Sequence, residues 1–191
     1  MTALLDPSTT ERAGRVGLVD EGRGMRPDYP DERECRWLVD QGVKPDSIAM
    51  PRAVRAARLR FWQTTFDFND DGERSLIFME DRDWVAWQPR TGALACWRGV
   101  SFAINEDAID NPATYFAGGI LKVHRTPLEW LKADREGIVI VQPRYTYAML
   151  RHVRRLAFAD AVFARQVRGW LDPPKCAAEF LVETAAESRA A

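Results

Sequence analysis

Residues 120–142 read ILKVHRTPLEWLKADREGIVIVQ, and this stretch decides the fold class. Residues 120–124 are short and mostly apolar, as expected of a strand. The tetrapeptide 126–129 (TPLE) opens a helix, because it offers a capping hydroxyl, a proline suited to the first turn and a glutamate at the reciprocal capping position. Residues 138–141 are β-branched, which is typical of a strand buried on both faces. Strand, helix and buried strand predict a βαβ unit of a parallel sheet.

The alternation of strands and helices continues after this unit. We expect a helix over 145–153, a short strand over 156–159, a helix over 160–171 and a last strand over 179–183. Asp160 stands where an N-cap is needed, and the pair Pro173-Pro174 ends the second helix. The C-terminal part is therefore predicted to follow a βαβαβαβ order.

The preceding segment begins with helical signals. A helix is expected over 31–41, with Asp31 as N-cap and Glu34 completing a capping box. A second, short helix is expected from Pro51. In that helix Arg52, Arg55 and Arg58 would share one face, which is either a phosphate-facing stripe or a solvated surface.

From residue 60 the apolar spacing changes to that of extended chain. Strands are expected over 76–80, 84–88 and 93–97, with a hairpin turn at 89–92. This antiparallel meander carries Trp84, Trp87 and Trp97, which either fill the core and its rim or stack on nucleic-acid bases.

The predicted fold class is mixed α/β, with an N-terminal helix and antiparallel meander before the βαβαβαβ unit. We expect a flexible arm over 1–29, a helix and meander subdomain over 30–112, an α/β subdomain over 113–184 and a tail over 185–191.

Composition is that of an ordinary globular chain of 191 residues, with 46% hydrophobic residues and a net charge of -1. No apolar run approaches the roughly 20 residues of a membrane span, and the N-terminus lacks a signal-peptide pattern. The three cysteines are odd in number and far apart, which favours reduced thiols. We therefore expect a cytoplasmic protein that has no association with membranes.

Charge is distributed unevenly along the chain. Residues 144–171 contain six arginines and one acid, Asp160, whereas residues 67–83 contain seven acids and two arginines. The arginines could attract an anionic partner, form a solvated face, or pair with the acids of 67–83. The sequence leaves these three alternatives open.

The order of elements over 120–183 resembles the toprim domain of primases and topoisomerases. The preceding helix and meander look like the segment that precedes this domain in phage and plasmid primase-helicases. The resemblance covers roughly 150 residues and rests on element order and spacing. In that family a glutamate after the first strand and an Asp-x-Asp after the third hold magnesium for phosphoryl transfer.

Mapped onto this sequence, the family's glutamate falls on Arg125 and the glycine that follows it falls on Thr126. The Asp-x-Asp falls on Asp160-Ala161-Val162 and keeps only its first acid. An arginine repels a metal ion and can bind phosphate directly. The resemblance thus implies a degenerate toprim-like domain with no catalytic residues, metal or cofactor.

We expect a non-catalytic accessory protein of bacterial phage or mobile-element DNA metabolism. Its partner would be DNA or a replication protein. The candidate nucleic-acid-binding residues are His124, Arg125, Arg151, Arg154 and Arg155.

Two other hypotheses stay open. One is a protein-interaction module, an adaptor or inhibitor with no nucleic-acid role, that uses the acidic meander or the N-terminal arm. The other is an enzyme that uses His124, Glu129 and Asp160.

Overall fold

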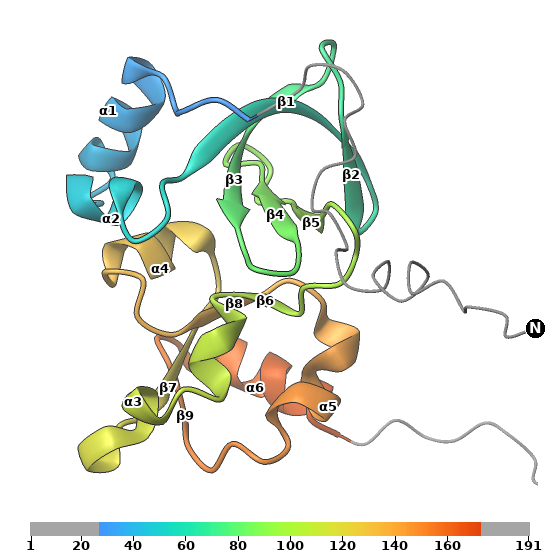
Figure 1. The fold of residues 1–191 in the computed structure, drawn as a ribbon. Helices are drawn as coiled ribbons and strands as arrows, with labels where there is room; N and C mark the ends of the chain where they lie inside the picture. Colours follow the sequence, from blue (N-terminus) through green and yellow to red (C-terminus); the bar gives the residue numbers. More distant parts are fainter. Residues whose placement is uncertain (1–26, 173–191) are drawn as a thin grey trace, which may run out of the picture.

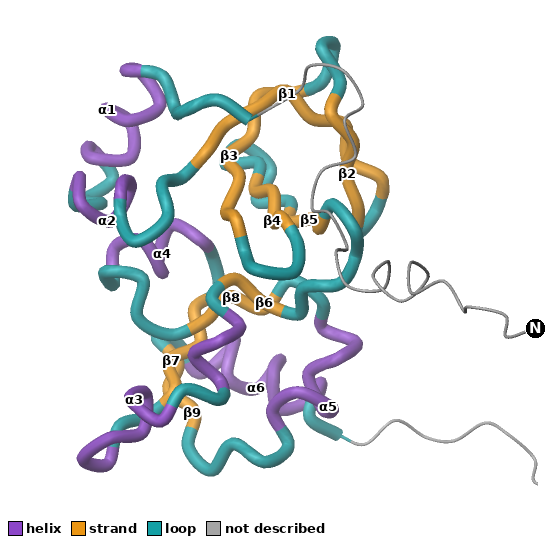
Figure 2. Tube along the Cα trace, in the orientation of Figure 1, coloured by secondary structure: helices purple, strands orange, loops and turns teal. Residues whose placement is uncertain are grey.

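The computed structural model describes residues 27–172, and it consists of a small barrel above a sheet that is flanked by helices (Figures 1 and 2). This confirms a mixed α/β chain. Most of the expected N-terminal arm, the strand expected over 179–183 and the tail over 185–191 lie outside the described residues. Within 27–172, no helix has the length and apolar character that a bilayer crossing requires.

Two helices precede the barrel. Helix α1 (Glu32–Asp40) forms as predicted, because Asp31 and Glu34 complete a capping box in which each carboxylate accepts the other residue's backbone N–H at 2.8 Å. Helix α2 (Pro45–Ala49) is one short turn that begins with a proline. It buries Ile48 in the same hydrophobic cluster that contains Leu38 of α1.

The predicted meander is present, and two further strands close it into a barrel. The strands are β1 (Arg55–Trp62), β2 (Thr65–Phe68), β3 (Glu73–Met79), β4 (Trp84–Trp87) and β5 (Leu94–Cys96), in the order β1-β2-β5-β4-β3. All neighbouring pairs are antiparallel except β2 and β5, which run parallel where Thr65 lies opposite Cys96. This single long-range pairing leaves the barrel without a free edge.

The short helix predicted from Pro51 is wrong, because that segment leads into strand β1. Ala57 and Leu59 face the barrel interior, whereas Ala56 packs against the cluster that contains α1. Strand β1 therefore buries apolar side chains on both of its faces. For this reason its sequence lacks the alternation of apolar and polar residues that indicates a strand. The arginines at positions 55 and 58 lie on the strand and not on one face of a helix.

The tryptophans of the meander pack in the hydrophobic core or at its edge. Trp87 is buried, and Trp84 and Trp97 are half-buried and stacked with their ring centroids 4.9 Å apart. Phe68 packs edge-on against both stacked rings. The structure thus favours the core interpretation of these indoles over the base-stacking one.

The second layer is a four-stranded sheet with the order β6-β8-β7-β9. Its strands are β6 (Ala103–Ile104), β7 (Leu121–His124), β8 (Ile138–Ile140) and β9 (Leu156–Phe158). Strands β8 and β9 both run parallel to β7, as the sequence predicts, and β6 adds an antiparallel edge. The strands expected near 120–124, 138–141 and 156–159 are confirmed, while the full βαβαβαβ unit is not.

Helices and 3-10 turns connect and cover this sheet. They are η1 (Glu106–Ile109), α3 (Pro112–Tyr115), η2 (Phe116–Gly118), α4 (Pro127–Lys132), η3 (Pro143–Tyr145), α5 (Thr146–Leu150) and α6 (Ala161–Trp170). Asp160 caps α6 by accepting the Phe163 N–H at 2.7 Å, as predicted. The helix expected over 145–153 ends at Leu150. Arg151, Arg154 and Arg155 lie in the segment that connects it to β9.

The sheet is buried on both faces. Val139 of β8 belongs to the cluster shared by the barrel, α1 and α4, whereas Ile138 and Ile140 face α6. This accounts for the uninterrupted β-branched run in the sequence. In Figure 1 the sheet lies between the barrel and the orange helices α5 and α6, so the molecule has three layers.

Candidate functional site

The C-terminal layer carries positive charge that has few ion-pair partners among the residues that the structure describes. The six arginines of residues 144–171 are exposed and have no carboxylate within 4.0 Å among residues 27–172; they are Arg144, Arg151, Arg154, Arg155, Arg165 and Arg168. The acids of 67–83 instead pair locally, as in Asp81 with Arg52 and Glu73 with Arg90. The alternative that the two charged segments neutralise each other is therefore wrong.

Three of the predicted residues follow α5 at the amino end of β9. Arg154 and Arg155 line a cavity of about 450 Å³ together with Gly118 and Gly119. Arg155 donates from Nη1 to the carbonyl of Gly118 at 3.3 Å, and Arg151 lies over the ring of Tyr147 at 5.9 Å. The guanidinium of Arg154 makes no hydrogen bond or ion pair with any other residue of 27–172.

The other two predicted residues lie at the carboxyl end of β7 and have local partners. A ring nitrogen of His124, Nε2, lies 2.8 Å from the carbonyl oxygen of Glu136. The guanidinium of Arg125 lies 3.8 Å from Asp160 and 5.3 Å from the centroid of the Phe163 ring. These contacts hold Arg125 beside the amino end of α6.

The five predicted residues therefore form two groups and not one surface. Because β7 and β9 run parallel with Val123 opposite Phe158, Arg125 lies level with position 160, whereas Arg155 precedes β9. Five residues of strand correspond to roughly 16 Å at a rise of about 3.3 Å per residue. The two groups lie at opposite ends of the parallel strands.

The acids near Arg125 have structural roles. Asp160 caps α6, and Glu129 accepts the backbone N–H of Arg125 at 3.0 Å. The sequence predicts that Glu129 accepts the backbone N–H of the N-cap residue, Thr126. In the structure Glu129 accepts the N–H of Arg125, the residue before the N-cap. Among residues 27–172, no three His, Cys, Asp or Glu side chains are arranged to hold a metal ion.

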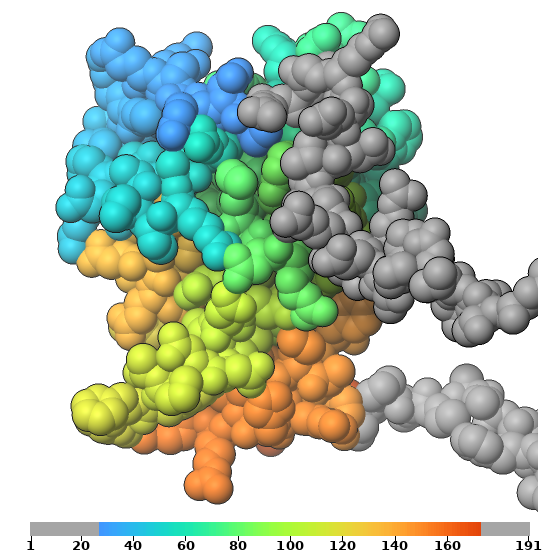
Figure 3. All heavy atoms as spheres, viewed as in Figure 1, coloured from blue at the N-terminus to red at the C-terminus, as the bar shows by residue number. Residues whose placement is uncertain are grey.

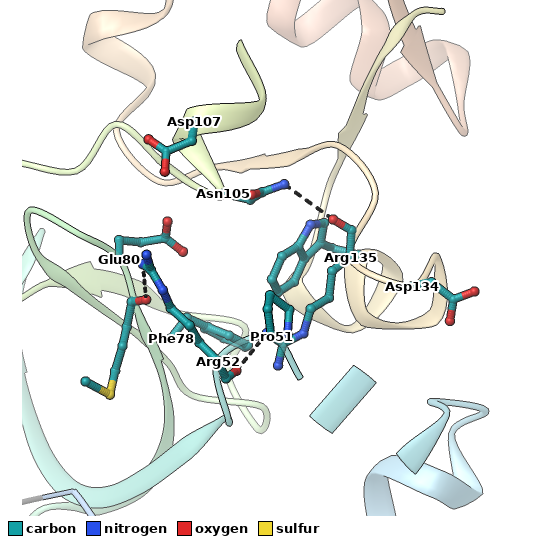
Figure 4. A pocket seen from close by; sticks show the side chains of 10 residues that line it. Pro51, Arg52, Phe78, Glu80, Asn105, Asp107, Asp134 and Arg135 are labelled. Carbon is teal, nitrogen blue, oxygen red and sulfur yellow. Dashed lines mark hydrogen bonds between the residues drawn. The ribbon is translucent and has the colours of Figure 1, made fainter. Parts of the chain in front are cut away.

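A second candidate site lies between the barrel and the sheet (Figure 4). This cavity of about 400 Å³ has an aromatic wall of Phe78 and Trp130, whose ring centroids are 5.7 Å apart. Glu80, just after β3, and Asp107 of η1 lie on one side of it, and Arg135 lies on the other. Burial raises the pKa of Glu80, Asp107 adds to this effect, and Arg52 opposes it.

Arg135 connects two segments of the chain at the wall of this cavity. Its guanidinium donates to the carbonyls of Ser47 and Arg52, both at 2.7 Å, and lies 5.3 Å from the Trp130 ring. Desolvation by burial lowers the pKa of Arg135. Among the described residues, the lining of this cavity contains no histidine, cysteine or hydroxyl side chain that could act as a nucleophile.

Sequence reasoning misses the cavity between the layers, because Glu80, Asp107 and Arg135 come from distant segments without a shared motif. It also misses Gly118 and Gly119, which precede a strand and so do not match a phosphate-binding loop. The fold nevertheless brings them to Arg154 and Arg155. Only the pairing of β7 with β9 reveals this proximity.

Comparisons with protein-family models, curated proteins and solved structures give no significant match.

Proposed function

We propose that this protein is a non-catalytic nucleic-acid-binding accessory protein that uses the arginines of its C-terminal layer. The observation that carries the proposal is the set of six exposed arginines without carboxylate partners among the described residues. Arginine presents a planar fork of donors that matches phosphate oxygens. A cluster of such side chains gives affinity for a phosphate backbone by releasing condensed counterions.

The resemblance to toprim domains supports a place in the DNA metabolism of bacterial phages or mobile elements. Three parallel strands in the order β8-β7-β9 agree with the coarse architecture that this resemblance implies. The non-catalytic part of the proposal rests on Arg125, which stands where the family has a metal-binding glutamate. The fixed positive charge of Arg125 beside Asp160 disfavours a divalent ion there.

The test is fluorescence anisotropy with labelled single- and double-stranded DNA at low and moderate salt, with and without magnesium. The wild-type chain is expected to bind with micromolar or tighter affinity that falls with salt and does not need magnesium. Replacing both Arg154 and Arg155 by Ala is expected to weaken binding roughly 10-fold or more at about 0.1 M salt, because two phosphate contacts are lost.

The matched control is the double variant Arg33→Ala/Arg36→Ala on α1, at the opposite end of the molecule (Figure 1). It removes the same charge from an exposed helix, and its affinity is expected to stay near the wild-type value. No binding by the wild-type chain at low salt refutes the proposal and favours the protein-interaction alternative. An equal loss in both double variants indicates non-specific attraction only.

A further inference from the structure

The loop between α3 and β7 exposes one aromatic ring almost completely. Phe116 is 82% exposed, the largest value among the large hydrophobic residues of the described chain. Other exposed aromatic side chains have a ring or guanidinium partner, such as Tyr29 with Arg55 and Trp62 with Arg60. Phe116 has no such partner among residues 27–172. A single exposed apolar side chain is ordinary on a folded protein, so the role of Phe116 has to come from the backbone and the side chains around it.

The backbone around Phe116 is firmly held, so the exposure is not that of a loose segment. Tyr115 donates its hydroxyl to the carbonyl of Ile109 at 2.7 Å, and the Thr114 hydroxyl donates to the carbonyl of Ala108 at 2.8 Å. A Cβ on Gly119 would lie 2.1 Å from the Thr114 carbonyl oxygen, which shows how closely the chain folds back. These contacts hold the backbone of the loop on both sides of Phe116.

The residue after Phe116 is conformationally strained. Ala117 has φ 51° and ψ 33°, the left-handed region that a side chain disfavours. Strained backbone of this kind persists only where the surrounding structure enforces it, and it is found most often at functional sites. The yellow segment that contains this turn projects from the molecule in Figures 1 and 3.

The same loop forms one wall of the cavity that Arg154 and Arg155 line. Gly118 and Gly119 belong to that wall, and the hydrogen bond from Arg155 to Gly118 joins the loop to the arginines. His152 adds a third basic group, which faces Asp110 at 3.6 Å. The residue with the exposed ring therefore lies in the chain between Tyr115 and Gly118, which line this cavity together with Arg154 and Arg155.

We propose that this loop binds single-stranded nucleic acid, with Phe116 stacking on an unpaired base while Arg154 and Arg155 contact the adjacent phosphates. The inference deepens the proposed function and rests on it. Stacking on aromatic rings is the general means by which proteins bind unpaired bases without reading sequence. A base inside a duplex offers no free face, so the ligand class is single-stranded DNA or RNA. The preorganised loop avoids an ordering cost on binding.

The experiment compares wild type with Phe116→Ala and Phe116→Trp, using labelled single strands and duplexes over a series of salt concentrations. Phe116→Ala is expected to weaken single-strand binding by about 10-fold, as for the loss of one stacked base. The slope of log affinity against log salt is expected to stay unchanged, because no phosphate contact is removed. Phe116→Trp is expected to retain the affinity, and duplex binding is expected to change little.

Tyr29→Ala is the matched control, because it removes another exposed aromatic side chain, just before α1, at the opposite end of the molecule. If wild type binds DNA and Phe116→Ala binds single strands equally well, the stacking inference is wrong while the proposed function stands. If wild type binds no DNA, both fail together. Binding of the wild type, but not of Phe116→Ala, to phosphatidylserine–phosphatidylcholine vesicles, without a change in DNA affinity, would assign the loop to membranes and overturn the inference.

Discussion

Asp83 is expected to be the most sensitive charged residue of the barrel. It is 3% exposed, and its carboxylate accepts four backbone N–H groups. Oδ1 accepts from Trp84 and Arg98, both at 2.8 Å, and Oδ2 accepts from Val100 at 2.7 Å and Ser101 at 3.2 Å. These bonds join β4 to the chain that leaves β5 for the sheet.

The magnitude follows from the donors that a substitution leaves without an acceptor. Each buried N–H without an acceptor costs about 1–3 kcal/mol. Because three of the four donors are only partly buried and gain water, we expect Asp83→Ala to lower the free energy of unfolding by about 3–5 kcal/mol. Asp83→Asn keeps one acceptor oxygen for two of the backbone N–H groups but turns an NH₂ group toward the other two. We expect it to lower the free energy of unfolding by about half as much as Asp83→Ala.

The assay is equilibrium unfolding in urea followed by tryptophan fluorescence. The matched control is Asp81→Asn. Asp81 is exposed, and within the described part of the chain it makes only a surface ion pair with Arg52, for which less than about 1 kcal/mol is expected. A loss below about 1 kcal/mol for Asp83→Ala, or equal losses at positions 81 and 83, would refute this reasoning.

Three further predictions concern buried groups. Burial raises the folded-state pKa of Glu80 above its ordinary 4.5, so the free energy of unfolding falls as the pH rises from 4.5 through the folded-state pKa. The melting temperature of Glu80→Gln should therefore equal that of wild type near pH 4 and exceed it at pH 7. Burial raises the pKa of the Cys96 thiol to about 12, so Ellman's reagent should modify it only after unfolding, and fast modification of native Cys96 would contradict its placement. Gly137→Ala should lower the free energy of unfolding in urea by more than about 1 kcal/mol, because φ is 85° and a Cβ would lie 2.3 Å from the Lys122 carbonyl oxygen; unchanged stability would contradict the tight contact.

Local signals in the sequence predict the parts of the fold that depend on local interactions. The capping box of Asp31 and Glu34, the N-caps at Thr126 and Asp160, and the buried β8 all form as expected. The sequence does not indicate the closed barrel, because closure depends on one long-range pairing of Thr65 with Cys96. The arginine spacing before β1 suggests a helix, and the tertiary pairing of β1 with β2 and β3 overrides it.

The candidate site is predictable only in its chemistry. The excess of arginine over 144–171 is visible in the sequence, but the separation of Arg151, Arg154 and Arg155 from His124 and Arg125 depends on the register of β7 and β9. Phe116 carries no sequence signal, since an aromatic residue before Ala117-Gly118-Gly119 is equally compatible with a buried position. Its exposure becomes evident only once Tyr115 and Thr114 are seen to fix the loop.

The most direct test of the central claim is the salt dependence of single-strand DNA affinity for wild type and for Arg154→Ala/Arg155→Ala. Each phosphate contact contributes about 0.7 to the slope of log affinity against log salt for a single strand. We predict that the double variant flattens this slope by about 1.4 and that Arg33→Ala/Arg36→Ala leaves it unchanged. Identical slopes for all three proteins, or no binding at low salt, would contradict a nucleic-acid interface at these arginines.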